Sequence, residues 1–195
     1  MEIIQTRRSI RKFHPEPVPE ESVRRILTAA HAAPSAHNTR PWRFVVLREE
    51  KARRLLAERM AAAYARDAEA DGVDAEKTRS RNDRSVERIA GAPLAVLACM
   101  DEACLPKNAG RGAVGERLLL VQSVAAAVEN LLLAAAAEKL GACWLCAPAF
   151  CPSAVAEALS LPKHWIAQAL VLIGFPAESP FPPRGSVLDE VVEWR

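Results

Sequence analysis

The chain has 195 residues, which suits a single domain, and half of them are hydrophobic, enough for a sizeable core. Its 26 basic and 24 acidic residues leave a net charge of +2 and are interleaved along the chain, which argues against an electrostatic nucleic-acid binder. The charged N-terminus lacks the apolar stretch of a signal peptide, so we expect a cytoplasmic protein.

Apolar residues recur at helical or strand spacing along the chain, and turn residues separate the runs. Glu20 and Glu21 follow Pro19, as expected for the first turn of a helix. The first half is predicted to contain this helix to about residue 32, a strand at 42–47, charged helices at about 49–71 and 75–89, and a buried strand at 94–100. The two charged helices form a helical insertion over about 49–92.

A long Ala-rich run over about 116–139 is apolar on nearly every face. Because Ser123, Glu129 and Asn130 interrupt it, we predict a helix buried in the core or between subunits rather than a membrane span. The remaining elements are a strand at 142–147, a helix after Pro152, a strand at 167–173 and a Pro-rich tail at 180–195. This alternating order predicts an α+β fold in three layers, with helices flanking a mixed central sheet.

The five cysteines are scattered and odd in number, which indicates reduced thiols. Cys143 and Cys146 have the spacing of a redox or zinc motif, and Cys99 and Cys104 could add two ligands. However, Cys143 lies in a run that reads as a strand, where residues three apart face opposite sides. We therefore interpret the cysteines as small buried hydrophobic residues and predict no metal site.

A basic segment near the N-terminus carries Arg7, Arg8, Ser9 and Arg11. Arginine presents planar, permanently charged donors that fit phosphate oxygens, so this set suits a phosphorylated ligand, although such clusters can also be solvated surface. A second polar segment at 33–42 contains Pro, Ser, Asn and Thr, which favour turns that expose backbone donors. Together the two segments are consistent with a cradle for a nucleotide or a flavin.

These segments, with the helix between them and the strand after them, resemble the FMN-dependent nitroreductase family. Stretches at 123–135, 140–145 and 183–192 are similar to the family's central helix, to the strand whose end lies against the isoalloxazine, and to its C-terminal phosphate contact and closing strand. The resemblance implies a nitroreductase-like fold, with one FMN-binding domain over 1–195. It also implies a homodimer in which the subunits exchange their C-terminal arms.

The resemblance further implies which residues contact FMN. They are Arg7, Arg8, Ser9, Arg11, Pro34, Ser35, Asn38, Leu145, Cys146 and Arg184. The arginine segment would bind the phosphate, the ribityl hydroxyls and the pyrimidine edge, residues 34–38 would reach the partner subunit's flavin, and residues 145–146 would cover one ring face. Arg8 could equally form a surface salt bridge, and Asn38 could be a simple turn residue. Ser186 stands where the family often has a second cation.

Two other polar residues near these contacts are given no catalytic role. His37 is interpreted as a solvent-facing loop residue. Ser123 stands where the family commonly has Asp, and its hydroxyl can bond within the buried helix. Hydride transfer through FMN needs no protein nucleophile, so no catalytic side chain is predicted.

The implied function is a ping-pong FMN oxidoreductase that takes hydride from NAD(P)H and passes it to an electron-poor acceptor. A narrower likeness, at 70–73, 149–152 and 161–165, is to the FMN-binding C-terminal domain of the γ-glutamyl ligase that builds the deazaflavin coenzyme. This leaves two alternatives: a protein of deazaflavin-coenzyme biosynthesis without the ligase domain, and a non-catalytic flavin-binding protein. No nucleic-acid or membrane partner is expected.

Overall fold

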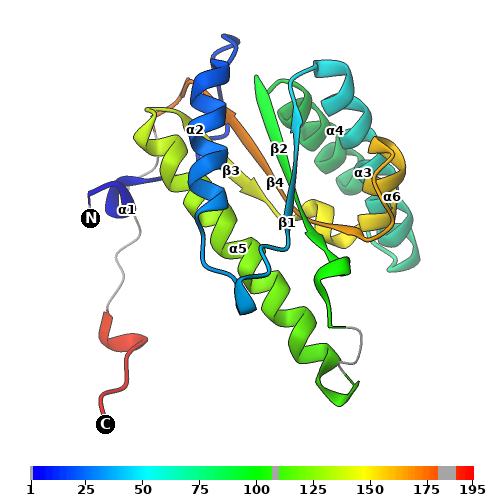
Figure 1. Ribbon diagram of the computed structural model, residues 1–195. Helices are drawn as coiled ribbons and strands as arrows, with labels where there is room; N and C mark the ends of the chain where they lie inside the picture. The colour runs from blue at the N-terminus through cyan, green and yellow to red at the C-terminus, as the bar shows by residue number, and fades with distance from the viewer. Residues whose placement is uncertain (1, 107–109, 180–187) are drawn as a thin grey trace.

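The computed structural model describes residues 2–106, 110–179 and 188–195 (Figure 1). The helices are α1 (Glu2–Thr6), α2 (Glu20–His31), α3 (Glu50–Ala70), α4 (Ala75–Ala90), α5 (Ala113–Ala137) and α6 (Pro152–Leu159). The strands are β1 (Trp42–Leu47), β2 (Leu94–Asp101), β3 (Gly141–Leu145) and β4 (Trp165–Gly174). Each predicted helix and strand before the tail is therefore present, with small shifts of its ends.

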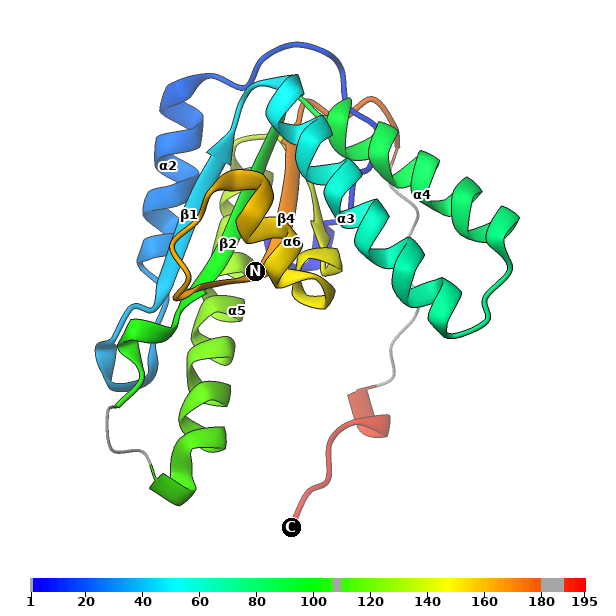
Figure 2. The same cartoon turned by 90° about the vertical axis from the view of Figure 1, so that its right-hand side faces the viewer.

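The elements form three layers, as predicted. Helices α2 and α5 cover one face of the sheet, and α3, α4 and α6 lie on the other face (Figures 1 and 2). Successive residues of β2 point to opposite faces, so Val96 joins the α2–α5 side of the core and Leu97 joins the other side. All residues of β2 are buried, which is expected for a strand covered on both faces.

The strand order is β1-β2-β4-β3, and every neighbouring pair is antiparallel, so the predicted mixed sheet is wrong. The direction of β2 follows from the α3–α4 hairpin, which leaves the sheet and returns to the same end. As a result Ala95, near the start of β2, pairs with Leu47 at the end of β1. Within the described residues, the parallel contact is an isolated bridge between Ser9 and Ala142.

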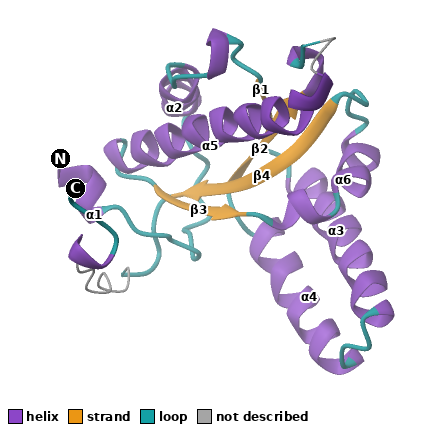
Figure 3. Cartoon of the chain, turned by 90° about the horizontal axis from the view of Figure 1, so that it is seen from below, coloured by secondary structure: helices purple, strands orange, loops and turns teal. Residues whose placement is uncertain are grey.

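Helix α5 crosses the sheet and extends beyond it (Figures 1 and 3). Its second half is buried, and Asn130 Nδ2 donates to the Ala29 carbonyl of α2 at 3.1 Å. Its first turns are exposed: Val114 is 83% and Leu118 54% accessible. By length and composition α5 could cross a membrane, but its inner face packs against the sheet and α2. The buried-helix prediction is thus confirmed for the second half of α5.

The predicted closing strand at 187–192 is not formed in its described part, because Leu188–Glu190 is a single 3-10 turn. This turn lies away from the sheet of its own chain (Figures 1 and 2). A strand needs a neighbouring strand for its backbone hydrogen bonds, and the described chain places none beside these residues. The exchange of C-terminal arms between subunits stays a prediction.

The basic segment 7–11 lies against the start of β3, where the sheet has a free edge. The Ile10 N–H donates to the Ala142 carbonyl at 3.0 Å. A Cβ at Gly141 would lie only 2.7 Å from Ile10 Cβ, closer than real Cβ atoms approach. Glycine at this position therefore allows the backbone of the basic segment to reach the sheet.

We expect Gly141→Ala to lower the free energy of unfolding by about 1–3 kcal/mol, the usual cost of overpacking a core contact. The physical reason is the overlap of the new methyl group with Ile10. Urea unfolding measures the effect. Gly115→Ala is the matched control, because Gly115 lies in α5 with nothing within 4 Å of an added Cβ. The control should be neutral or more stable by about 0.5–1 kcal/mol. Equal stability of Gly141→Ala and wild type would contradict the prediction.

Candidate functional site

Arg7, the first residue of the basic segment, is half-buried beside α5. Its Nε atom is 3.5 Å from Glu129 Oε1, which makes an ion pair. The same Nε is buried and has no hydrogen-bond partner among the described residues. Glu129 therefore engages this Nε through the ion pair alone, while the two terminal guanidinium nitrogens of Arg7 have no described partner. This observation favours an anion site at the basic segment.

Arg8 and Arg11 play different parts. Arg8 Nη1 donates to the carbonyls of Gln5 and Arg7 at 2.8 and 2.6 Å, so Arg8 caps the end of α1. The surface salt bridge considered for Arg8 does not form within the described part of the chain. Arg11 is anchored by its backbone N–H, which donates to Glu178 Oε1 at 2.6 Å, and its exposed guanidinium makes only a 3.5 Å contact with the Ser9 carbonyl. The Arg11 side chain is thus available to a ligand.

A small cavity of about 280 Å³ lies beside this segment. Arg7, Arg8 and Lys139 line it, with Gly141 and the carboxylate of Glu178. Three cations around one cavity outweigh the single acid, and guanidinium groups match phosphate oxygens in shape. The donor set therefore fits a phosphate group. Arg184, and with it Ser186, lies outside the described residues.

The polar turn after α2 is held against α5 by Ser123. The Ser123 hydroxyl accepts from the Ala36 N–H at 3.1 Å and donates to the Leu119 carbonyl at 2.7 Å. The prediction that this hydroxyl bonds within the helix is confirmed. Its role as anchor of the turn was missed, because nothing in the sequence pairs residues 87 positions apart.

The backbone of this turn is strained. His37 and Asn38 have φ values of 51° and 53°, a left-handed backbone conformation that residues other than glycine rarely adopt. Both side chains are exposed, which confirms the prediction for His37. Ser35 Oγ accepts from the Arg40 N–H at 3.0 Å and closes the turn. The Asn38 side chain is thus exposed, and its Oδ1 accepts from Arg40 Nε at 3.4 Å.

The two polar segments of one chain are not brought together. The basic segment and α1 lie beside the C-terminal half of α5, whereas the turn at 35–38 contacts α5 through Ser123, on the side of α2 (Figure 1). No described hydrogen bond or ion pair joins them. This arrangement is compatible with the expectation that the turn serves the site of a partner subunit.

Leu145 and Cys146 come at the end of β3. Leu145 is half-buried against the α3–α6 side of the core, whereas Cys146 is exposed and precedes the short turn Ala147–Phe150. The interpretation of all cysteines as buried is therefore wrong for Cys146, because the strand ends one residue before it. It holds for Cys99 and Cys143: burial raises the pKa of Cys99 to about 12 and also raises the pKa of Cys143.

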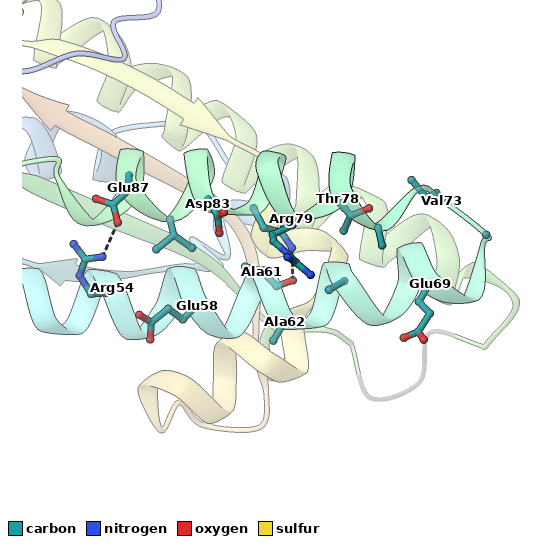
Figure 4. Close-up of a pocket in the computed structure, with 15 residues that line it drawn as sticks. Arg54, Glu58, Ala61, Ala62, Glu69, Val73, Thr78, Arg79, Asp83 and Glu87 are labelled. Carbon is teal, nitrogen blue, oxygen red and sulfur yellow. Dashed lines mark hydrogen bonds and ion pairs between the residues drawn. The ribbon is translucent and has the colours of Figure 1, made fainter.

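Two larger hollows lie near the helical insertion. One, of about 540 Å³, is bounded by α3, α4 and the turn after β3, and Cys146 and Ala147 belong to its wall. The other is a groove of about 880 Å³ between α3 and α4, lined by small and charged side chains (Figure 4). Its Arg54 is already paired with Glu50 and Glu87, and no predicted site residue lines it. We therefore take as the candidate site the surroundings of β3, from the basic segment at its start to Cys146 after its end. Within the described residues no group of metal ligands is present.

Comparisons with known proteins identify relatives of the whole chain. A sequence model described as Nitroreductase family matches residues 4–175. The NADH dehydrogenase of Thermus thermophilus is 34% identical and aligns over 97% of this chain and 92% of its own. The 5,6-dimethylbenzimidazole synthase of Rhodospirillum rubrum is 32% identical over 90% of this chain and 81% of its own. A nitroreductase-like protein of Desulfovibrio desulfuricans, solved in complex with FMN, is 28% identical, with a TM-score of 0.75 over 100% of this chain and 95% of that chain.

We expect Ser123→Ala to loosen the turn at 35–38. The change leaves the Ala36 N–H without its acceptor, which should lower the free energy of unfolding by about 1–2 kcal/mol. Hydrogen exchange of the peptide covering 33–42 should become faster. Ser80→Ala, on the exposed face of α4, is the control and should change neither measurement. Unchanged exchange of this peptide in Ser123→Ala would show that the hydroxyl does not hold the turn.

Proposed function

The chain belongs to the nitroreductase family and is an FMN-dependent oxidoreductase, and we propose that it passes hydride from NAD(P)H to an electron-poor acceptor by a ping-pong mechanism. FMN, when bound, supplies the chemistry that accepts and donates the hydride. The observation that carries this proposal is the cavity beside β3 that Arg7, Arg8 and Lys139 line. Such a cavity suits the single phosphate of FMN.

The basic segment provides the proposed phosphate and ring contacts. Arg7 and Arg8, with Arg184, would hold the phosphate, and Ser9 would bond the ribityl chain. Arg11 would lie at the pyrimidine edge, where a fixed cation stabilises negative charge on the reduced ring. Its free guanidinium supports this role, since its backbone N–H is bonded to Glu178 while the side chain keeps its donors.

The other contacts would come from the end of β3 and from a second subunit. Leu145 and Cys146 would cover one face of the ring and exclude water from it. Pro34, Ser35 and Asn38 would reach the flavin of the partner subunit, and the strained, anchored turn is suited to holding Asn38 outward. The exposed apolar start of α5 also favours a homodimer, because isolated proteins rarely leave such residues uncovered. We place this dimer in the cytoplasm.

A role in deazaflavin-coenzyme biosynthesis is the alternative proposal for the acceptor. Its support is the 540 Å³ hollow, because two of the three stretches that carry the narrower likeness contribute to its wall. Asp71 comes from the first stretch, and Phe150 and Cys151 come from the second. A hollow of this size beside the ring could receive a tricyclic acceptor. Titration with a deazaflavin, followed by its fluorescence, would test this alternative: lack of binding would remove it.

Purified protein should be yellow and release FMN, not FAD, on denaturation. Initial rates measured against NAD(P)H at several menadione concentrations should give parallel double-reciprocal lines, because the first product leaves before the acceptor binds. Chromatography of the released flavin and stopped-flow bleaching by NADH alone provide the measurements. Intersecting lines would contradict the ping-pong order. Bound FMN without turnover would instead favour the non-catalytic flavin-binding alternative.

We expect FMN to protect Cys146 from alkylation. Cys146 is exposed and lies at the proposed ring face, whereas burial and a raised pKa keep Cys99 and Cys143 unreactive. Iodoacetamide labelling of the flavin-free protein, followed by peptide mass spectrometry, should modify Cys146 first. Saturating FMN should slow this labelling about tenfold or more, while the partly exposed Cys104 serves as internal control. Equal labelling of Cys146 with and without FMN would place the flavin elsewhere.

A further inference from the structure

Tyr64 of α3 and Arg81 of α4 form a pair across the helical hairpin. Arg81 Nη1 donates to the Tyr64 hydroxyl at 2.7 Å, and the guanidinium carbon lies 4.6 Å from the centre of the Tyr64 ring. The ring attracts the cation while the hydroxyl accepts its hydrogen bond. One aromatic side chain thus fixes both the position and the orientation of one guanidinium.

Arg81 differs from a neighbouring hairpin arginine in having no carboxylate partner. Arg54, also in the hairpin, is paired with Glu50 at 3.0 Å and Glu87 at 2.8 Å. No described carboxylate lies within ion-pair distance of Arg81, and one nitrogen is engaged by Tyr64. A guanidinium presents several N–H groups, so those that Tyr64 does not use remain available. They can bind a carboxylate through two parallel hydrogen bonds.

The pair borders the 540 Å³ hollow, which Cys146 and Ala147 also line. The same hollow is lined by Phe150, a large aromatic residue that is 81% exposed. A planar molecule can therefore lie between the proposed ring face at Cys146 and the oriented cation of Arg81, with aromatic surface beside it. Such surface favours a flat, apolar ring.

We propose that Tyr64 and Arg81 form a subsite that selects planar aromatic acceptors carrying one anionic group, such as a carboxylate. The inference rests on the proposed function, which places the flavin against Cys146. Arg81 determines specificity by contacting the anionic group, and Tyr64 positions Arg81. Asp67 and Asp71 line the same hollow, so a second negative charge on the acceptor meets repulsion.

The same pair could instead only join the two helices of the hairpin. A purely structural tether would affect charged and neutral acceptors alike, because it would act through the position of the hairpin. A direct contact would affect charged acceptors alone. The ratio of KM values for an acid and its neutral isostere separates these two roles.

The test compares 4-nitrobenzoate with 4-nitrobenzamide in the flavin-loaded enzyme. Arg81→Gln should raise KM for the acid about tenfold, the size of one charge-assisted hydrogen bond, and change KM for the amide less than about twofold. Tyr64→Phe, which keeps the ring but loses the hydroxyl, should raise KM for the acid by a smaller factor. Asp67→Asn should lower KM for the acid, because it removes a repelling charge.

Arg79→Gln is the matched control, since Arg79 is on the same helix but lines the other groove (Figure 4). It should leave both KM values unchanged.

Calorimetric binding of 4-nitrobenzoate to wild type and Arg81→Gln gives a readout that does not depend on turnover. Tighter binding of the acid to wild type than to Arg81→Gln supports the subsite, even if no acceptor is reduced. A lack of reduction of every acceptor would refute the proposed function. If Arg81→Gln changed the KM values for acid and amide equally, or changed neither, the subsite would be overturned. FMN-dependent turnover of the amide would still support the proposed function.

Discussion

The close approach of Ile10 to Gly141 determines where the basic segment lies. Its backbone hydrogen bond to Ala142 covers the free edge of β3, an edge that would otherwise expose unpaired backbone groups. The same contact brings Arg7 to Glu129 and directs the segment past the cavity beside β3. Backbone packing at a glycine, rather than the ion pairs of the arginines, therefore positions the proposed phosphate contacts.

Much of the fold could be predicted because hydrophobic spacing reports burial directly. Strand β2 is covered on both faces and appears in the sequence as a continuous apolar run at 94–100. Strand direction could not be predicted in this way, since it depends on the end of the sheet to which the preceding helices return the chain. The prediction of a mixed sheet was wrong for this reason. The closing strand at 187–192 was wrong in its described part because valine-rich residues form a strand only beside another strand.

The candidate site was predictable where side-chain chemistry alone was informative. Clustered arginines are typical of anion binding, so residues 7–11 could be proposed as a phosphate site without a structure. The contacts that hold the site could not. Ser123 and Ala36 meet across 87 positions, and Tyr64 and Arg81 meet only because α3 and α4 pack with a particular relative rotation. Neither contact has a sequence motif, since each depends on packing between separate elements.

Carboxylate pairing, rather than the net charge of +2, separates arginines whose donors are used within the fold from arginines that keep donors for a ligand. Arg25 and Arg43 lie within 2.7 Å of the carboxylates of Glu138 and Asp101, and pairs of this kind use up their donors within the fold. Arg11 and Arg81 make no such pair among the described residues; Tyr64 holds the Arg81 guanidinium, whereas Glu178 anchors only the backbone of Arg11. A fixed cation with free donors loses little conformational entropy when it binds an anion. Arg11 beside β3 and Arg81 at the hollow that reaches Cys146 therefore lie where proposed cofactor and acceptor would each present negative charge.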